Sequence, residues 1–311
     1  LSSVFGLPLP NSLTDCLNLT VEQARTLFGG FQDVELVGRG PDKVVFRGTI
    51  GSAVYALKVF TKPKHFDSSQ HTVESLRIRA EWEVLAFRAC LSPHIAQPGP
   101  VGLSCATVDG CDVMYFSESF IEGQGLECLI GDVGVLPTRE VISLGIQVTN
   151  AIRSLWRVGK VHRDIKPGNI MVNQKSDRYT LLDAGLVFDI AGDLLHDVIP
   201  RGTLRYHAPE QFGRSRRSPV VDFRADIYSL GTTMYEAATG RHPFSTEAQT
   251  PWRLFYSIRT VQPEPPTRQA PQLPASVEAI ILRMLAKAPH DRYLTCDRLL
   301  EDLKKNTQTT G

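Results

Sequence analysis

One short stretch of the chain, VHRDIKPGNIMV, places three polar side chains of complementary chemistry close together. Asp164 can accept a proton from a hydroxyl group, and Lys166 can neutralise phosphate charge. The side-chain oxygen of Asn169, five positions after Asp164, can ligate a magnesium ion. In an ordinary surface loop, so many residues of complementary chemistry would have to occur together by chance. The stretch therefore indicates a loop that acts on phosphate groups.

A second acidic residue follows in TLLDAGLVFD, where Asp183 stands fourteen positions after Asn169. Asp-x-Gly is a common turn, because Asp bonds its own backbone and Gly tolerates positive φ. The residue types alone therefore leave two interpretations of Asp183, a turn residue that ends a strand and a second metal ligand.

Two further features belong to a strand-rich segment nearer the N-terminus. In VGRGPDKVVF, Gly38 and Gly40 could let backbone amides approach a phosphate, although two glycines in a hairpin also make a plain turn. In YALKVF, Lys58 lies between apolar neighbours. An inward-facing Lys58 requires an anion, for which Glu81 is suitable, whereas an edge-strand lysine would face water.

The elements that would position these residues change in character along the chain. Residues 20–28 read as a short helix, with Thr20 as N-cap and Gln23 completing a capping box. Residues 31–60 are rich in Val, Tyr and Phe and predict strands, and 70–90 predict a helix. Two more strands are predicted near 100–106 and 111–118.

After Gly123 the periodicity becomes helical in four stretches: REVISLGIQVTNAIRSLWRVG, ADIYSLGTTMYEAATG, SVEAIILRMLAK and TCDRLLEDLKK. Gly240 is a natural stop for the second, and Ser276 is the expected N-cap of the third. Strands first and helices afterwards predict an α+β protein with a small sheet lobe and a larger helical lobe.

The bulk composition is that of a soluble globular protein, with 311 residues, 42% of them hydrophobic and 22% charged. The net charge of +1 gives no reason to expect a nucleic-acid partner. No apolar run approaches the roughly 18 residues of a membrane-spanning helix. The six cysteines are scattered and form no Cys-x-x-Cys pair, which indicates reduced thiols. Reduced thiols favour a cytoplasmic location.

Taken in order, these motifs resemble the protein kinase family, in particular the bacterial, eukaryotic-like Ser/Thr kinases. The resemblance runs from about residue 34 to 303 and includes His207-Ala208-Pro209-Glu210, Asp226 in RADIYSLG and Arg292 in HDRYLT. It implies the bilobal protein kinase fold, a small antiparallel β-sheet lobe with one main helix and a larger, mostly helical lobe. The implied domains are an extension at 1–30, a kinase domain at 31–305 with its hinge at 119–123, and a tail at 306–311.

The resemblance also implies a role for each site residue, with ATP and Mg²⁺ as cofactors. Asp164 would deprotonate the attacking hydroxyl, Lys166 would contact the γ-phosphate, and Thr203 would support both. Asn169 and Asp183 would hold magnesium, which favours the metal-ligand interpretation of Asp183. The implied nucleotide-binding residues are Val37, Gly38, Gly40, Lys43, Val45, Ala56, Lys58, Glu81, Ser119, Ile121 and Met171.

Three residues outside the reaction site have structural roles under the same resemblance. Glu210 and Arg292 would form a buried ion pair in the helical lobe, and Asp226 would anchor the backbone of the catalytic loop. Within the activation segment, from Asp183 to Glu210, Thr203 is the only Ser or Thr. We therefore expect activity without phosphorylation of this segment.

Several positions depart from the family pattern. Ala184 replaces the usual Phe after the metal-binding Asp, Pro41 removes one amide donor from the phosphate loop, and Lys43 replaces its third glycine. Glu118 occupies the gatekeeper position, which usually faces the nucleotide pocket.

The leading interpretation is an active Ser/Thr protein kinase with a protein substrate, and residues 1–30 could engage a regulatory partner. The first alternative is a nucleotide-binding pseudokinase with a regulatory or scaffold role. The second is a small-molecule kinase, and the Ala-Pro-Glu segment with Asp226 and Arg292 argues against it.

Overall fold

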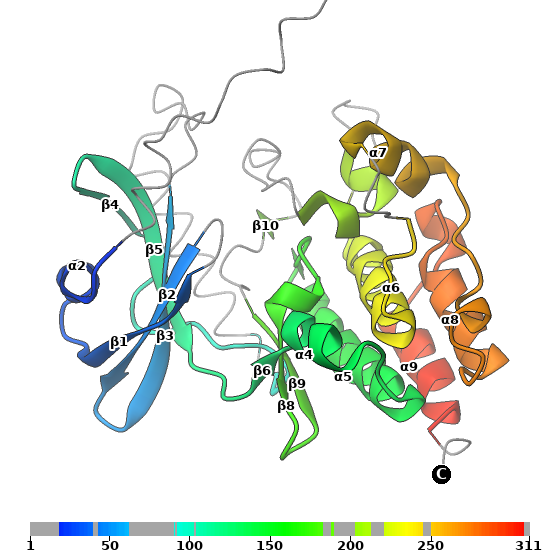
Figure 1. The fold of residues 1–311 in the computed structure, drawn as a ribbon, viewed down its shortest axis with the longest axis horizontal. Coiled ribbons are helices and arrows are strands. Elements are labelled where there is room, and N and C mark those ends of the chain that lie inside the picture. Colours follow the sequence, from blue (N-terminus) through cyan, green and yellow to red (C-terminus); the bar gives the residue numbers. More distant parts are fainter. Residues whose placement is uncertain are drawn as a thin grey trace, which may run out of the picture. The chain divides into compact units, whose positions relative to one another are not determined.

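The computed structural model describes residues 19–39, 43–61, 90, 92–102, 104–182, 188–189, 203–212, 221–244 and 250–307. The chain divides into two compact units, one of Leu1–Leu85 with Gln97–Phe120 and one of Ala86–Ala96 with Ile121–Gly311. We refer to them as the sheet unit and the helical unit (Figure 1).

The sheet unit is built on five antiparallel strands in the order β1-β2-β3-β5-β4. The strands are β1 (Gln32–Arg39), β2 (Lys43–Ile50), β3 (Ala53–Thr61), β4 (Ser104–Val108) and β5 (Cys111–Ser119). Gly51, with φ of 60°, supplies the left-handed backbone conformation in the tight connection between β2 and β3. Alternation along β2 turns Val44 and Phe46 to one face of the sheet and Val45 and Arg47 to the other.

A short helix, α2 (Val21–Leu27), packs against one face of this sheet. The predicted capping box is confirmed, because Gln23 N–H donates to Thr20 Oγ1 and Thr20 N–H donates to Gln23 Oε1. Ala24 and Phe28 join a buried apolar cluster with strand residues such as Phe46 and Leu57. The structure therefore shows α2 packed against the sheet.

The helical unit contains six α-helices among the described residues, which are α4 (Leu126–Val133), α5 (Thr138–Arg157), α6 (Phe223–Thr239), α7 (Pro251–Thr260), α8 (Ala275–Met284) and α9 (Cys296–Lys305). Its short strands are β6 (Gln124–Gly125), β7 (Lys160–Val161), β8 (Ile170–Asn173), β9 (Arg178–Leu181) and β10 (Phe188–Asp189). They pair as β6-β8-β9 and as β10-β7.

Helix α5 forms the centre of this unit and packs against both α6 and α9 (Figure 1). Its residues Val141, Leu144, Val148 and Ile152 recur at helical spacing and are fully buried or nearly so. A Cβ at Gly145 would lie 2.8 Å from the Cε of Met234 on α6, so the absence of a side chain allows the two helices to approach closely. This core is the rigid support for the loop that follows β7.

Most predicted elements are confirmed, with shifts at their ends. The strand expected at 100–106 begins only at Ser104, and the expected N-cap Ser276 lies inside α8, whose N-cap is Pro274. Pro274 fixes the backbone angle needed before a helix, and the hydroxyl of Ser276 instead bonds the side chain of Asn306. The helix expected at 70–90 falls almost wholly outside the described residues. Among the described helices, none has both the length and the apolar character needed to cross a bilayer.

Candidate active site

A buried carboxylate on α6 fixes the backbone of the loop after β7 through hydrogen bonds. Asp226 accepts hydrogen bonds from the backbone N–H groups of His162, at 2.8 Å, and Arg163, at 2.7 Å. Burial raises the pKa of Asp226, and the two amide donors oppose that shift because they favour the charged form. Arg163 adopts a left-handed φ of 65°, which is uncommon for a side chain of this size. The predicted anchoring role of Asp226 is confirmed.

Asp164 sits in this loop with its two carboxylate oxygens in different environments. Its Oδ2 accepts from Asn169 Nδ2 at 2.8 Å and lies 3.0 Å from the ammonium of Lys166. Its Oδ1 is buried and has no hydrogen-bond partner among the described residues. Oδ2 is thus fixed by its neighbours, whereas Oδ1 is an acceptor whose hydrogen-bonding capacity no described residue uses.

Asn169 is positioned by a short 3₁₀ turn, Pro167–Asn169, and is buried. Its Nδ2 donates to both the backbone carbonyl and the Oδ2 of Asp164, at 2.9 and 2.8 Å. Because both acceptors are oxygens, the amide must present its nitrogen to Asp164, which leaves Oδ1 on the other side. An amide oxygen of this kind is a ligand that magnesium accepts.

The residue immediately before Asp183 is tied to the same loop. The N–H of Leu182 donates to the carbonyl of Asn169 at 2.8 Å, and Nε2 of His162 contacts the carbonyl of Leu182 at 3.0 Å. Nδ1 of His162 accepts from the N–H of Asp164, so the ring proton lies on Nε2 and donates to Leu182. Asp183 itself lies outside the described residues, but the chain that leads to it is fixed beside Asn169.

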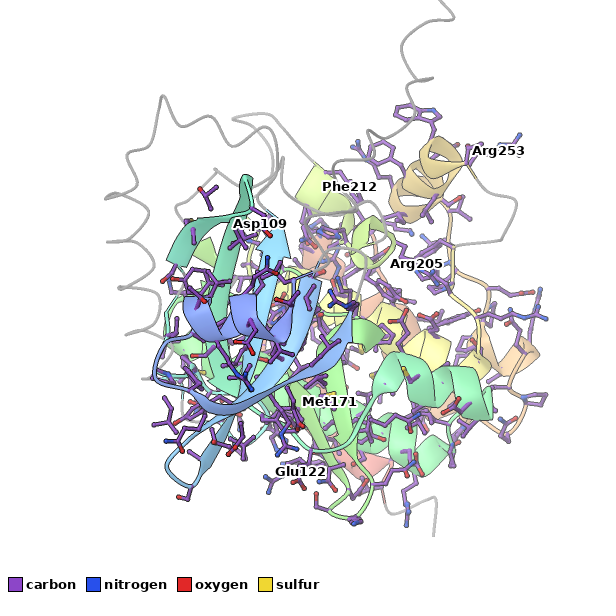
Figure 2. All side chains as sticks on the ribbon, turned by 60° about the vertical axis from the view of Figure 1, so that its left-hand side comes forward. Asp109, Glu122, Met171, Arg205, Phe212 and Arg253 are labelled. Atoms are coloured by element: carbon purple, nitrogen blue, oxygen red, sulfur yellow. The ribbon has the colours of Figure 1, made fainter. Side chains whose placement is uncertain are left out.

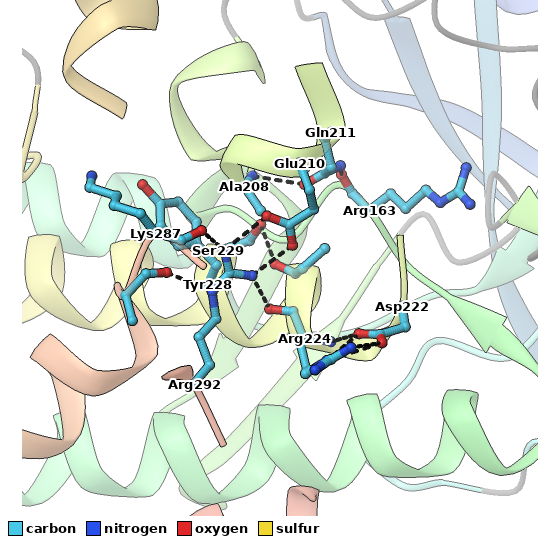
Figure 3. Close-up of polar contacts among 12 residues, drawn as sticks. Arg163, Ala208, Glu210, Gln211, Asp222, Arg224, Tyr228, Ser229, Lys287 and Arg292 are labelled. Carbon is cyan, nitrogen blue, oxygen red and sulfur yellow. Dashed lines mark hydrogen bonds and ion pairs between the residues drawn. The ribbon is translucent and has the colours of Figure 1, made fainter. Parts of the chain in front are cut away.

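The predicted ion pair between Glu210 and Arg292 is confirmed and is shown in Figure 3. The guanidinium donates to the two carboxylate oxygens at 2.7 and 2.8 Å and also to the carbonyls of Ala286, Arg224 and Lys287. All five N–H groups of Arg292 therefore have acceptors, and its side chain is completely buried. Such a fully satisfied pair fixes the segment around Glu210 to the helical core.

The side chain of Gln211 was not predicted to have any role. Its Oε1 accepts from Ala208 N–H at 2.8 Å, and its Nε2 donates to the carbonyl of Arg163 at 3.0 Å (Figure 3). Gln211 thereby ties the catalytic loop to the segment that carries Glu210. In the sequence its only signal is its place directly after His207-Ala208-Pro209-Glu210.

In the sheet unit, three of the predicted nucleotide residues share one face of the sheet. Val45 pairs with Lys58 across β2 and β3, and Ala56, two residues before Lys58, points to the same side. Lys58 is buried and forms an ion pair with Glu118 of β5, with Nζ and Oε1 2.5 Å apart. The expected need of Lys58 for an anion is confirmed. The anion that the structure shows is Glu118, and Glu81 lies outside the described residues.

The other predicted nucleotide residues vary in how fully they are described. A Cβ at Gly38 would meet no atom within 4 Å, so packing does not require a glycine there. Ser119 Oγ already accepts from the N–H of Gln97. Val37, Lys43 and Ile121 lie in described segments, and Met171 lies on β8 in the helical unit (Figure 2). Outside the described residues or side chains are Gly40, Pro41, Glu81, Asp183, Ala184 and the side chain of Thr203.

Comparison with known families finds that residues 31–303 match the model of the protein kinase domain. The chain is 30% identical over 277 residues to the serine/threonine-protein kinase PknE of Mycobacterium tuberculosis, which covers 88% of this chain and 45% of that protein. It is 27% identical to a probable serine/threonine-protein kinase of Clostridium perfringens, over 88% of this chain and 38% of that protein. The chain thus spans less than half the length of these relatives.

Solved structures resemble the chain in fold at lower sequence identity. The kinase domain of Mycobacterium tuberculosis PknI matches with a TM-score of 0.66 and 24% identity, over 90% of this chain and 96% of that one. A structure of Rad53 in complex with AMP-PNP matches with a TM-score of 0.65 and 21% identity, over 88% of this chain and 65% of that one. The fold predicted from the sequence is confirmed.

Proposed function

The chain belongs to the protein kinase family, and from this premise we propose that it transfers the γ-phosphate of ATP to serine or threonine hydroxyls of a protein. The observation that carries this proposal is the unequal environment of the two Asp164 oxygens. Oδ2 is fixed by Asn169 and Lys166, so the orientation of Oδ1 is set before a substrate arrives.

In the proposed reaction the substrate hydroxyl donates a hydrogen bond to Asp164 Oδ1. Its oxygen attacks the γ-phosphorus, the bond from that phosphorus to the β,γ-bridging oxygen breaks, and the proton passes to Asp164. Lys166, 3.0 Å from Asp164 Oδ2, is the residue proposed to neutralise charge on the transferred phosphoryl group. The products are a phosphorylated protein and ADP.

Magnesium is the metal that the family implies, and the donor set suits it. Asn169 offers Oδ1, because both of its amide hydrogens are directed to Asp164, and Asp183 is the second proposed ligand. When bound, the ion neutralises charge on the β- and γ-phosphates. The proposed nucleotide contacts of the sheet unit are Lys58 for the phosphates and Val45 and Ala56 for the adenine.

Three further proposals concern regulation and location. Thr203 is the only Ser or Thr from Asp183 to Glu210, which supports activity without phosphorylation of this segment. Residues 1–30 are the proposed site for a regulatory partner. Cys296 is a buried free thiol, and this supports a reducing, cytoplasmic location.

The test is phosphoryl transfer from γ-labelled ATP with magnesium to a generic basic protein. We expect Asp164→Asn to lower the rate by about 10²- to 10⁴-fold, since it removes a general base. Asp297→Asn, at an exposed pair with Arg153, should leave the rate unchanged. A phosphatase-treated sample should keep its rate. Transfer by none of these proteins, with ATP still raising the melting temperature, would instead support the pseudokinase alternative.

A further inference from the structure

The Lys58–Glu118 pair lies on the face of the sheet that carries the proposed nucleotide residues. In the register of β3 and β5, Ala56 is opposite Glu118 and Lys58 is opposite Phe116. Residues that are paired across strands project to the same face. Glu118 therefore points to the side of Val45, Ala56 and Lys58, whereas Leu57 and Val59 point to the core that packs on α2.

The two charged groups are almost entirely removed from water. Both side chains are 3% exposed, and the ammonium and carboxylate are 2.5 Å apart. Lys58 Nζ also lies 5.9 Å from the ring centroid of Phe116. A charge-assisted hydrogen bond in such surroundings is strong, and separation of the partners would leave a buried carboxylate with less compensation.

The backbone at Glu118 is fixed on both sides, so the carboxylate cannot leave by a shift of the strand. On one side β5 pairs with β3 throughout this region. On the other side Gly99 N–H donates to Ser117 O, Ser119 N–H donates to Gln97 O, and Pro98 bridges to Glu118. The backbone of Lys58 is likewise held between β2 and β5, so the two groups can separate only by side-chain rotation, for which the four rotatable bonds of Lys58 give the longer reach.

We propose that Glu118 is a specificity-determining residue that competes with nucleotide phosphates for Lys58 and so sets the affinity of the protein for ATP. This inference rests on the proposed function, in which Lys58 binds the phosphates. A phosphate that approaches Lys58 meets a cation already neutralised at close range and is repelled by the carboxylate. The competition acts only on ligands that carry phosphates, so adenosine is not subject to it.

The test measures the dissociation constants of MgATP and of adenosine by calorimetry for the 311-residue chain and its variants. Glu118→Gln keeps the size and an acceptor oxygen but removes the charge. We expect it to bind MgATP about tenfold more tightly than the unmodified chain, with adenosine affinity unchanged. In a Lys58→Met background the same substitution should change MgATP affinity by less than about twofold.

A matched control is Glu35→Gln, which removes a carboxylate from the same sheet. Glu35 lies opposite Arg47 and pairs with it at 2.8 Å, but it is 59% exposed and lies on β1, two strands away from Lys58 on β3. We expect this control to leave both dissociation constants unchanged. If Glu118→Gln does not fold, Glu118→Asp replaces it, because the shorter side chain withdraws the carboxylate from Lys58 and should tighten MgATP binding to a smaller extent.

The outcomes separate this inference from the proposed function. If MgATP binds and Lys58→Met weakens it, but Glu118→Gln leaves affinity unchanged or lowers it, the competition is wrong and Glu118 instead supports Lys58. Equal tightening of MgATP and adenosine would also overturn it, since the effect would not involve phosphate. If neither the unmodified chain nor the Glu118 variant binds MgATP, both the inference and the proposed function fail.

Discussion

Two buried ion pairs, one in each unit, have similar chemistry but different surroundings. Arg292 and Glu210 meet through two hydrogen bonds, and the remaining donors of Arg292 reach three backbone carbonyls. Lys58 Nζ and Glu118 Oε1 are 2.5 Å apart, on a sheet face that also carries proposed ligand-binding residues. The guanidinium of the first pair is enclosed in backbone contacts, whereas the second pair joins a flexible lysine to a carboxylate on the neighbouring strand.

The difference follows from the side chains themselves. Arg presents five donors in a rigid plane, so a site that satisfies all of them holds it in one orientation. Lys is a compact charge on a flexible stem, and it can exchange one oxygen partner for another. A buried ion pair that contains Arg therefore suits a contact that holds two segments together. One that contains Lys suits a site where a ligand anion competes with the carboxylate for the ammonium.

The largest expected effect on stability is at the Arg292–Glu210 ion pair. Arg292→Lys keeps the charge but cannot reach both Glu210 oxygens and three carbonyls, so buried acceptors lose their donors. We expect it to lower the free energy of unfolding by about 3 to 5 kcal/mol, as for a broken buried pair. Urea denaturation followed by circular dichroism would measure this loss.

The matched control for that substitution is a surface pair on α9. Arg298 and Glu301 are each 58% exposed and 2.9 Å apart. Arg298→Lys should change the free energy of unfolding by less than about 0.5 kcal/mol. A loss at Arg292 no larger than that of the control would contradict a structural role for the enclosed pair.

A smaller effect is expected at Asp226, a buried carboxylate that accepts hydrogen bonds from two backbone amides. Asp226→Asn leaves one amide oxygen for two N–H donors, and its own NH₂ group would oppose the second. We expect a loss of about 2 to 3 kcal/mol in the free energy of unfolding, together with slower phosphoryl transfer. MgATP affinity should be unchanged, because the hydrogen bonds described for the Asp226 side chain go to the backbone of the loop.

Denaturation, calorimetry and the transfer assay on one preparation would check that prediction. Asp222→Asn is a suitable comparison, because Asp222 caps the same helix and pairs with Arg224 near its start. Equal effects of the two substitutions on transfer would show that Asp226 acts only through the stability of α6.

The sequence predicted those parts of the site whose partners recur at fixed spacing or in a family pattern. Asp164, Lys166 and Asn169 lie within one loop, so local spacing brings them together. The pairing of Glu210 with Arg292 joins residues far apart in the chain, and only the resemblance could predict it. The capping box of Thr20 and Gln23 followed from local chemistry alone.

The unpredicted contacts are those that depend on strand register or on a single side chain. The sequence identified Glu118 as unusual, but the pairing of β3 with β5 was needed to place it beside Lys58. Gln211 has no periodic or motif signal beyond its neighbours, and its two hydrogen bonds join segments distant in sequence. The start of α8 was misjudged because Ser276 is a good N-cap by type, whereas Pro274 already fixes the entry to the helix.

The last prediction concerns a buried polar group that must stay uncharged, unlike the members of both ion pairs. Nδ1 of His242 accepts from Phe244 N–H at 3.1 Å, so Nε2 carries the proton that donates to the carbonyl of Arg205 at 2.8 Å. Burial and the nearby Arg205 lower the pKa of His242 from 6.5 to about 3. A protonated ring could not accept from Phe244, and its charge would be buried beside a cation.

The unfolded chain therefore binds a proton at His242 that the folded chain excludes. Stability from this group is complete above pH 6.5 and falls as the pH drops from there toward 3. Between about pH 7 and pH 5 we expect the unmodified chain to lose about 2 kcal/mol more than His242→Gln does. Urea denaturation at several pH values would measure it, with the exposed His290→Gln as control. Parallel pH profiles for the unmodified chain and His242→Gln would mean that His242 accepts its proton in the folded state, and the contrast with the two ion pairs would then be lost.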